Sequence, residues 1–144
     1  LDHSKLSRSI ETPICLDESI SSVDRARQAI EIGACEYINI KPGRVGGITN
    51  SLKINELSEQ AGIPVWIGGM LESALGVAIC IELATLENFT YPGDLFPSSR
   101  FYSNDLFEPY NEFKSPYLFD PITDFPTPNE KLLKKFTVKE SHIA

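Results

Sequence analysis

The sequence lacks the long apolar runs that membrane-spanning helices need. Its 144 residues contain no stretch of about 18 consecutive apolar residues and no signal-peptide pattern. Basic residues are also too few to attract polyanions, since 13 of them stand against 20 acidic residues, for a formal net charge of −7. Because such a surface repels phosphate backbones and anionic lipids, we expect neither nucleic acid nor a membrane as a partner.

Cysteine is scarce and shows none of the paired spacings of a disulfide or metal framework. Cys15, Cys35 and Cys80 are odd in number and lie among apolar neighbours. We therefore expect three buried, reduced thiols and a cytoplasmic protein. A catalytic cysteine would need a base nearby. Neither histidine, His3 or His142, belongs to a motif that would supply it, so we expect both to be surface residues.

What the sequence does contain is the composition of a folded domain, with 42% hydrophobic and 23% charged residues. Short apolar runs alternate with runs of helical periodicity, which is typical of a chain of β-α units. The expected strands are 13–16, 36–41 and 63–67. The helices expected to follow them are, in the same order, 21–33, 48–61 and 71–86.

Capping residues and apolar spacing define these helices further. The first helix is expected to have Ser21 as its N-cap, with Asp24 three residues on, and to end at Gly33. The second is expected to stop at Gly62, and its buried stripe is predicted to comprise Ile48, Leu52, Leu57 and Ala61. The third is apolar on nearly every side, which indicates burial on more than one face.

Polar residues and glycines follow the expected strands directly. Asp17, Lys41 and Gly68-Gly69 stand where parallel strands of α/β proteins present their carboxyl ends to ligands. From residue 105 on, prolines recur without periodicity among tyrosines and phenylalanines. This pattern predicts an irregular segment with one short helix near its end, capped by Asn129.

Two of these polar positions carry candidate chemistry. Asp17 could give Mg²⁺ one hard oxygen ligand, although for this residue judged alone an acid at the start of a helix, or a solvated pair with Glu18, is the favoured interpretation. Since successive strand side chains face opposite ways, only one of Asp17 and Glu18 is expected to bind a metal. Asn39 and Lys41 share a face, and a lysine there near Arg44 suits acid–base chemistry. A surface lysine at a strand exit is the alternative.

Three segments taken together resemble a known family. Residues 12–19 (TPICLDES), 38–47 (INIKPGRVGG) and 65–73 (VWIGGMLES) are similar to consecutive barrel segments of o-succinylbenzoate synthases and the sister N-acylamino acid racemases, in the enolase superfamily. Two shorter matches, 91–95 (YPGDL) and 104–106 (NDL), follow in the same order.

The resemblance implies an α/β fold, the C-terminal part of a (β/α)₈ TIM barrel that is incomplete in this chain. Residues 1–104 would form the C-terminal half of the barrel, and residues 105–144 an irregular segment that returns toward a capping domain. The family's K-x-K strand, its earlier Asp and Glu metal ligands and its N-terminal capping domain are expected to precede Leu1. The 144-residue chain is therefore expected to be inactive by itself.

The resemblance also implies roles for single residues. Asp17 would be the third carboxylate ligand of a Mg²⁺ ion, supported by Glu18. Lys41 would stand on one face of a small-molecule carboxylate substrate, with Arg44 beside it. The residues that would line the substrate pocket are Asn39, Gly69, Met70 and Leu71.

In this family the metal holds the substrate carboxylate and stabilises the enediolate that forms when a proton leaves the α-carbon. In the synthase, a dehydratase of menaquinone biosynthesis, a second lysine is the acid/base and the lysine matching Lys41 stabilises the enolate. In the racemases and dipeptide epimerases both lysines exchange protons. A non-catalytic half-barrel is the remaining alternative, one that forms a homo-oligomer through its open strand edges or complements an N-terminal half.

Overall fold

The computed structural model describes residues 2–115 and 117–141, so His142 lies outside the described residues. The chain forms two compact units. The first, here called the sheet unit, comprises Leu1–Met70 and Ile79–Leu95. The second, the C-terminal unit, comprises Leu71–Ala78 and Phe96–Ala144.

Three parallel strands form the centre of the sheet unit. Their order is β1 (Cys15–Leu16), β2 (Tyr37–Ile40) and β3 (Val65–Ile67). In register, Leu16 lies opposite Ile38, and Ile38 lies opposite Val65. Single parallel bridges, Val65 to Phe89 and Gly68 to Asp94, extend the sheet beyond β3. The three strands expected from the sequence are confirmed.

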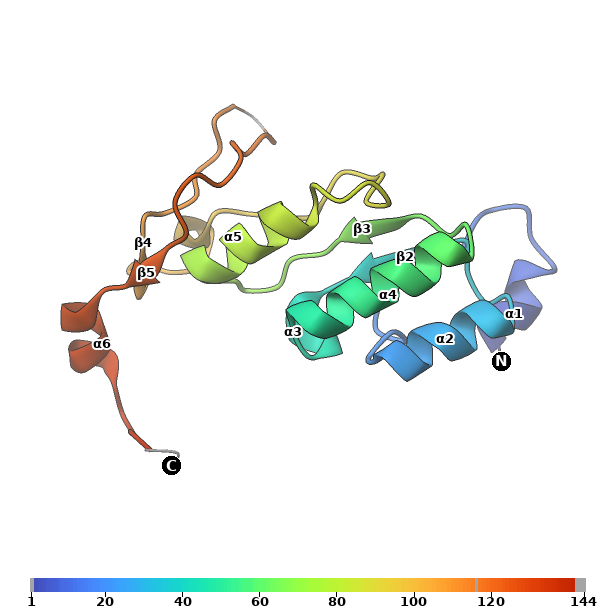
Figure 1. Cartoon of the computed structure of the whole chain (residues 1–144), viewed down its shortest axis with the longest axis horizontal. Helices are drawn as coiled ribbons and strands as arrows, with labels where there is room; N and C mark the ends of the chain where they lie inside the picture. Colours follow the sequence, from blue (N-terminus) through green and yellow to red (C-terminus); the bar gives the residue numbers. More distant parts are fainter. Residues whose placement is uncertain (1, 116, 142–144) are drawn as a thin grey trace. The chain divides into compact units, whose positions relative to one another are not determined.

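The sheet unit contains the helices α1 (Asp2–Ser7), α2 (Val23–Glu31), α3 (Pro42–Val45) and α4 (Ile48–Gln60). A further helix, α5 (Ala74–Leu83), has residues 79–83 in the sheet unit and residues 74–78 in the C-terminal unit. Helices α2 and α4 pack side by side (Figure 1). The sequence did not predict α3, which is a single turn that begins at Pro42 and ends at Gly46 with φ of 93°. A proline in the first turn and a left-handed glycine after the last are typical of such a helix.

The helix caps agree with the sequence except at one serine. Ser22, not Ser21, caps α2: its backbone is extended and its side chain accepts a hydrogen bond from the backbone N of Arg25 at 3.2 Å. The stops were predicted correctly, since Gly33 and Gly62 have φ of 59° and 67°. Only glycine adopts this left-handed conformation without strain.

The predicted buried stripe of α4 was wrong. Ile48 and Leu52 are exposed, whereas the buried residues of this helix are Ser51, Ile54 and Ser58. The Ser58 hydroxyl donates a hydrogen bond to the carbonyl of Ile54 at 2.8 Å, one turn earlier. This bond satisfies the polar group, and the small side chain lets the helix lie close to its neighbours. Hydrophobicity alone therefore selected the wrong face.

The core of the sheet unit lies between its helices and one face of the strands. That face consists of five buried aliphatic residues, Leu16, Ile38, Ile40, Val65 and Ile67. The opposite face carries Cys15, Asn39 and Trp66. Cys15 is exposed there, with its sulfur 3.2 Å from the indole nitrogen of Trp66. The prediction that all three cysteines are buried holds for Cys35 and Cys80 but is wrong for Cys15.

The C-terminal unit has little regular structure. It contains a 3₁₀ turn (Ser98–Arg100), the antiparallel pair β4 (Phe107–Glu108) and β5 (Thr127–Pro128), and α6 (Glu130–Phe136). The side chain of Asn129 accepts from the backbone N of Leu132 at 3.1 Å, as the predicted cap requires. A group of aromatic rings packs the irregular part: Phe96, Phe101, Phe113 and Phe119.

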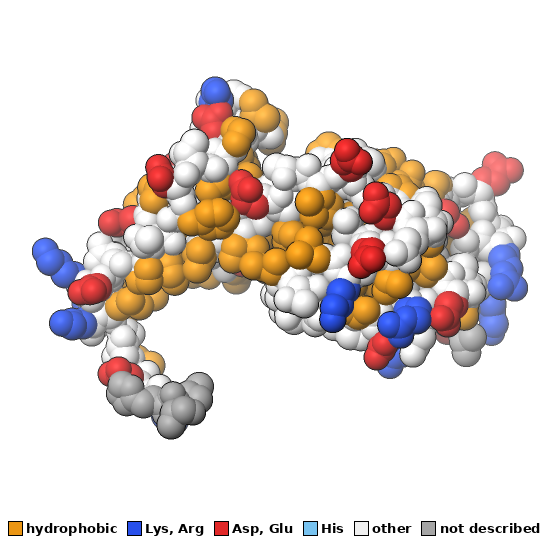
Figure 2. All heavy atoms as spheres, in the orientation of Figure 1, with side chains coloured by type: hydrophobic (Ala, Val, Ile, Leu, Met, Phe, Trp, Pro, Cys, Tyr) orange, Lys and Arg blue, Asp and Glu red, His pale blue; other side chains and the backbone are white. Residues whose placement is uncertain are grey.

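The surface of the sheet unit carries charges of both signs. Acidic and basic side chains are interspersed over the outer side of α2 and α4 (Figure 2). Within residues 2–115 and 117–141, no helix is both long and apolar enough to cross a membrane. His3 is exposed in α1, as predicted.

Candidate functional site

Two side chains predicted to share a site meet at the carboxyl edge of the sheet. Asp17 follows β1 directly and Lys41 follows β2 directly, and because these strands are parallel neighbours both residues reach the same edge. Lys41 Nζ lies 3.0 Å from Asp17 Oδ2. Their side chains are 19% and 28% exposed, so the pair is partly shielded from water but remains accessible.

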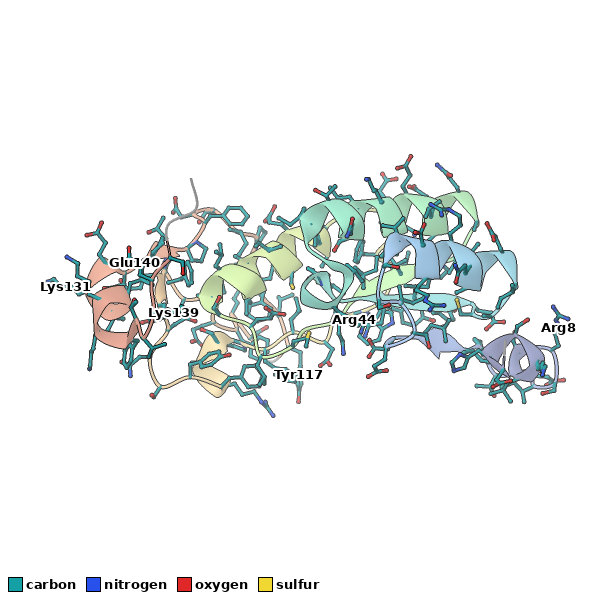
Figure 3. All side chains as sticks on the ribbon, turned by 90° about the horizontal axis from the view of Figure 1, so that it is seen from below. Arg8, Arg44, Tyr117, Lys131, Lys139 and Glu140 are labelled. Atoms are coloured by element: carbon teal, nitrogen blue, oxygen red, sulfur yellow. The ribbon has the colours of Figure 1, made fainter. Side chains whose placement is uncertain are left out.

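Arg44 is a second cation on the same carboxylate. It belongs to α3 (Figure 3), and its Nη1 pairs with Asp17 Oδ1. Its remaining nitrogens donate to backbone carbonyls, Nε to Ile20 at 3.0 Å and Nη2 to Asn39 at 2.7 Å. Burial lowers the pKa of the Arg44 guanidinium from its ordinary value. Arg44 thus links the turn after β1 to β2 through hydrogen bonds and holds the Asp17 carboxylate in place. The sequence indicated only that Arg44 is a cation near Lys41.

Asn39 lies on the same strand face as Lys41 and is 2% exposed. Among the described residues, its side-chain oxygen has no hydrogen-bond partner. Gly68, the residue directly after β3, faces it: a Cβ atom at position 68 would lie 2.7 Å from Cε of Lys41 and would overlap the amide of Asn39. Glycine at 68 therefore makes room for the side chains of Asn39 and Lys41.

The other residues predicted at the site lie after β1 and β3. Glu18 is exposed in a turn closed by a hydrogen bond from Ile20 N to Asp17 O. Gly69 N donates to the carbonyl oxygen of Asp94 at 2.8 Å, and a Cβ atom at 69 would lie 2.6 Å from that oxygen. Sequence reasoning missed this contact because Asp94 approaches through its backbone.

Met70 and Leu71 complete the predicted pocket lining, and both are exposed, by 53% and 68%. Met70 lies in the sheet unit and close to Gly43: if residue 43 had a Cβ atom, the Met70 sulfur would lie 3.8 Å from it. Leu71 begins the C-terminal unit.

Asp17 could be one ligand of a metal ion, but the described residues do not form a complete metal site. No group of three or more His, Cys, Asp or Glu side chains able to hold a metal occurs in the described part of the chain. At the sheet edge Asp17 is the carboxylate beside Lys41, and both of its oxygens face cations. Since Mg²⁺ requires several oxygen ligands in octahedral geometry, Asp17 would need further ligands to complete such a site.

Comparison with known proteins places this geometry in a family. Residues 1–119 match the family described as "Enolase C-terminal domain-like". The chain belongs to this family. The fold is accordingly α/β and corresponds to part of an enolase-superfamily TIM barrel.

Relatives and solved structures agree on the extent of the match. An N-succinylamino acid racemase of Thermus thermophilus is 51% identical over 114 residues, which are 79% of this chain and 31% of that protein. An o-succinylbenzoate synthase of Bacillus subtilis is 51% identical over 109 residues, 76% of this chain and 29% of that protein. The chain thus spans less than a third of the length of these curated relatives.

The crystal structure of an enolase-superfamily member from Listeria innocua superposes with a TM-score of 0.84 at 41% identity. The match covers 96% of this chain and 38% of the Listeria chain. Nearly all of this chain therefore corresponds to a minor part of a longer barrel protein, which makes it a partial barrel.

Proposed function

We propose that this chain supplies Asp17 and Lys41 to the active site of an enzyme that removes a proton from the carbon beside a carboxylate. The observation that supports the proposal is the 3.0 Å contact between Lys41 Nζ and Asp17 Oδ2 at the carboxyl ends of neighbouring parallel strands. The acid that binds the metal and the lysine that acts on the substrate must both lie close to the same small molecule. Asp17 and Lys41 are near enough to each other for this.

The reaction we propose first is the dehydration that forms o-succinylbenzoate in menaquinone biosynthesis, as the Bacillus relative is named for that product. A hydroxy-cyclohexadiene dicarboxylate loses the proton on its α-carbon and the hydroxyl group on the adjacent carbon, which leaves as water. The ammonium group of Lys41 then stabilises the negative charge that develops on the enolate. The base that takes the proton belongs to a part of the barrel outside this chain.

Racemisation of N-succinylamino acids is the second candidate, and the similarity to the Thermus racemase favours it equally. Here Lys41 would donate and accept the α-proton on its own face of the substrate. Deuterium incorporation at the α-carbon from both faces would support racemisation, whereas dehydration alone would exclude it.

Mg²⁺ is the metal we propose for the complete site, with Asp17 as one of its ligands. Bound there, Mg²⁺ would hold the substrate carboxylate and stabilise the charge of the enediolate. The other ligands would come from protein outside the described residues, because these contain no group of three or more His, Cys, Asp or Glu side chains that could hold a metal. Titration of the 144-residue chain with Mg²⁺ should show only weak binding, and tight binding would contradict the one-ligand interpretation.

Substitution of Lys41 in the complete protein tests the function directly. We expect Lys41→Ala to lower kcat/KM by about 10²–10⁴-fold, the usual contribution of a positioned catalytic group. Lys53→Ala is the matched control, because Lys53 is exposed on α4 and should leave the rate unchanged. Dehydration and racemisation are assayed with Mg²⁺ present. Equal rates in the Lys41→Ala and wild-type proteins would exclude the proposed role.

A further inference from the structure

Two cations share the carboxylate of Asp17, and they are held there in different ways. Arg44 pairs with Oδ1, and its other nitrogens donate to the backbone carbonyls of Ile20 and Asn39 at 3.0 and 2.7 Å. Lys41 reaches Oδ2 at 3.0 Å with the ammonium group at the end of a flexible stem. Arg44 is thus fixed by the backbone, whereas Lys41 is free to leave Oδ2.

The proposed role of Asp17 as a Mg²⁺ ligand requires one of its oxygens to be released. A divalent cation and an ammonium group repel each other strongly when they share one oxygen. Since Arg44 is anchored, we expect Lys41 to give up Oδ2 when Mg²⁺ binds, while Arg44 stays on Oδ1. The displaced ammonium group then needs another acceptor, because a shielded charge without a partner is costly.

A buried acceptor without a donor lies beside the lysine stem. Asn39 is 2% exposed, and its side-chain oxygen has no hydrogen-bond partner among the described residues. A Cβ atom at position 68 would overlap this oxygen and would lie 2.7 Å from Cε of Lys41, so the oxygen and the lysine carbon are neighbours around Gly68. Because Nζ is bonded to Cε, rotation about the last carbon–carbon bond of the lysine side chain can carry the ammonium group toward Asn39 Oδ1.

The surroundings of Asn39 distinguish its oxygen from a second buried oxygen of the same kind. Asn55 Oδ1 also has no hydrogen-bond partner within residues 2–115 and 117–141. Asn55 belongs to α4, however, and no residue of the candidate site belongs to that helix. Asn39 combines an unsatisfied oxygen with a cation whose present partner is a proposed metal ligand.

We propose that Asn39 is a positioning residue for Lys41: its side-chain oxygen accepts the ammonium group of Lys41 when Asp17 binds Mg²⁺. The role rests on the proposed function, since it takes Asp17 as a metal ligand. In the metal-free protein the ammonium group neutralises Asp17. In the metal-bound protein Asn39 keeps the same group on the open face of the sheet, ready for the substrate.

Asn39→Leu in the complete protein tests this role, because leucine has nearly the same shape as asparagine and no acceptor. We expect the dissociation constant of Mg²⁺, measured by isothermal titration calorimetry without substrate, to rise about tenfold, since the metal-bound form loses a hydrogen bond to a charged group. The urea midpoint of the metal-free protein should not fall, because the oxygen that is removed has no partner among the described residues in that state.

Asn55→Leu is the matched control, because it also removes an unsatisfied oxygen but does so on α4. This variant should leave the affinity for Mg²⁺ unchanged. If Asn39→Leu fails to fold, Asn39→Ala replaces it, since alanine removes the acceptor without adding bulk, and the same rise in the dissociation constant is expected.

A double-mutant cycle tests whether Asn39 acts through Lys41. Lys41→Ala alone should bind Mg²⁺ more tightly than the wild type, because no ammonium group competes for Asp17 Oδ2. In that background, Asn39→Leu should change the dissociation constant by less than about twofold. An equal loss of affinity with and without Lys41 would overturn the proposal, and so would an Asn39→Leu protein with wild-type affinity.

Failure of the proposed function gives a different set of results. A complete wild-type protein that does not bind Mg²⁺ would refute the metal role of Asp17 and the change of partner by Lys41 with it. A wild-type protein that binds Mg²⁺ but shows neither dehydratase nor racemase activity would refute the proposed reaction, while the titrations still decide the role of Asn39.

Discussion

The two faces of the three-stranded sheet differ in almost every property. The face under the helices is closed and aliphatic, with residues such as Leu16, Ile38 and Val65 almost wholly buried. The opposite face carries a thiol, an amide and an indole, and at its carboxyl edge an ion pair. Neighbouring residues along the chain thus have different surroundings. Ile38 and Ile40 are buried in the core, whereas Asn39 and Lys41 belong to the candidate site.

The difference follows from strand geometry. Successive side chains point to opposite sides, so one strand can contribute to a core and to an active site without compromise. The helix-covered face can be optimised for packing, and its residues are Ile, Val and Leu. The open face includes the buried side-chain oxygen of Asn39, which has no hydrogen-bond partner among the described residues.

The largest expected effect on stability comes from the helix-covered face. Ile38 is fully buried, so Ile38→Ala should lower the free energy of unfolding by about 2–5 kcal/mol, through lost burial and the cavity left behind. Urea denaturation measures it. The control is Ile48→Ala on the exposed side of α4, which should change stability by less than about 0.5 kcal/mol. A similar loss of unfolding free energy in both variants would contradict the expected difference between buried and exposed positions.

On the open face, Gly68→Ala should damage the site more than the fold. The new methyl group would displace Lys41 and the Asn39 amide, for which we expect a cost of about 1–3 kcal/mol in unfolding free energy. Misplacement of Lys41 should reduce kcat/KM of the complete protein by up to about 10²-fold. Gly43→Ala is the matched control, because its methyl group would meet only the Met70 sulfur at 3.8 Å. Full activity of Gly68→Ala would argue against this crowding.

The two faces should also differ in thiol chemistry. Cys15 is exposed and should react with iodoacetamide in the native protein, whereas Cys35 should react only on unfolding. Burial, with smaller contributions from Glu36 and Cys15, raises the pKa of Cys35 from 9.0 to about 12. The thiolate is the reactive form, so both burial and the high pKa protect Cys35.

The sign of the pH effect follows from that shift. Since the folded pKa of Cys35 lies above the unfolded value, the native protein keeps the proton longer than the unfolded chain. Its contribution to stability is complete below about pH 9 and is lost as the pH rises toward 12. Thermal unfolding between pH 8 and 11 should show a smaller loss in Cys35→Ala than in Cys15→Ala. An equal loss would contradict the prediction.

Some features were readable from the sequence because the physics is local. Gly33 and Gly62 end helices through a conformation that only glycine adopts freely, and Asn129 caps α6 through a bond to a residue three positions away. Alternation within INIK placed Asn39 and Lys41 on one face. The neighbouring segments then resembled one family strongly enough to indicate the barrel. None of these inferences required a distant contact.

The remaining features depend on parts of the chain far apart in sequence. The buried face of α4 follows from what packs against it, so Ser51 and Ser58 lie inside while Leu52 lies outside. The start of α5 depends on Asp105, 31 residues away, and the partners of Asp17 lie 24 and 27 residues away.

The sequence by itself determined the alternation of strands and helices, the family and the two residues most suited to the chemistry, because periodicity and short motifs are encoded within a few neighbouring positions. Only the tertiary structure decided that Arg44 pairs with Asp17 and that the absence of a side chain at Gly68 leaves room for Lys41. It also decided that Asp105 binds the first backbone N–H of α5. Each of these is a hydrogen bond or close contact between segments that the fold alone brings together.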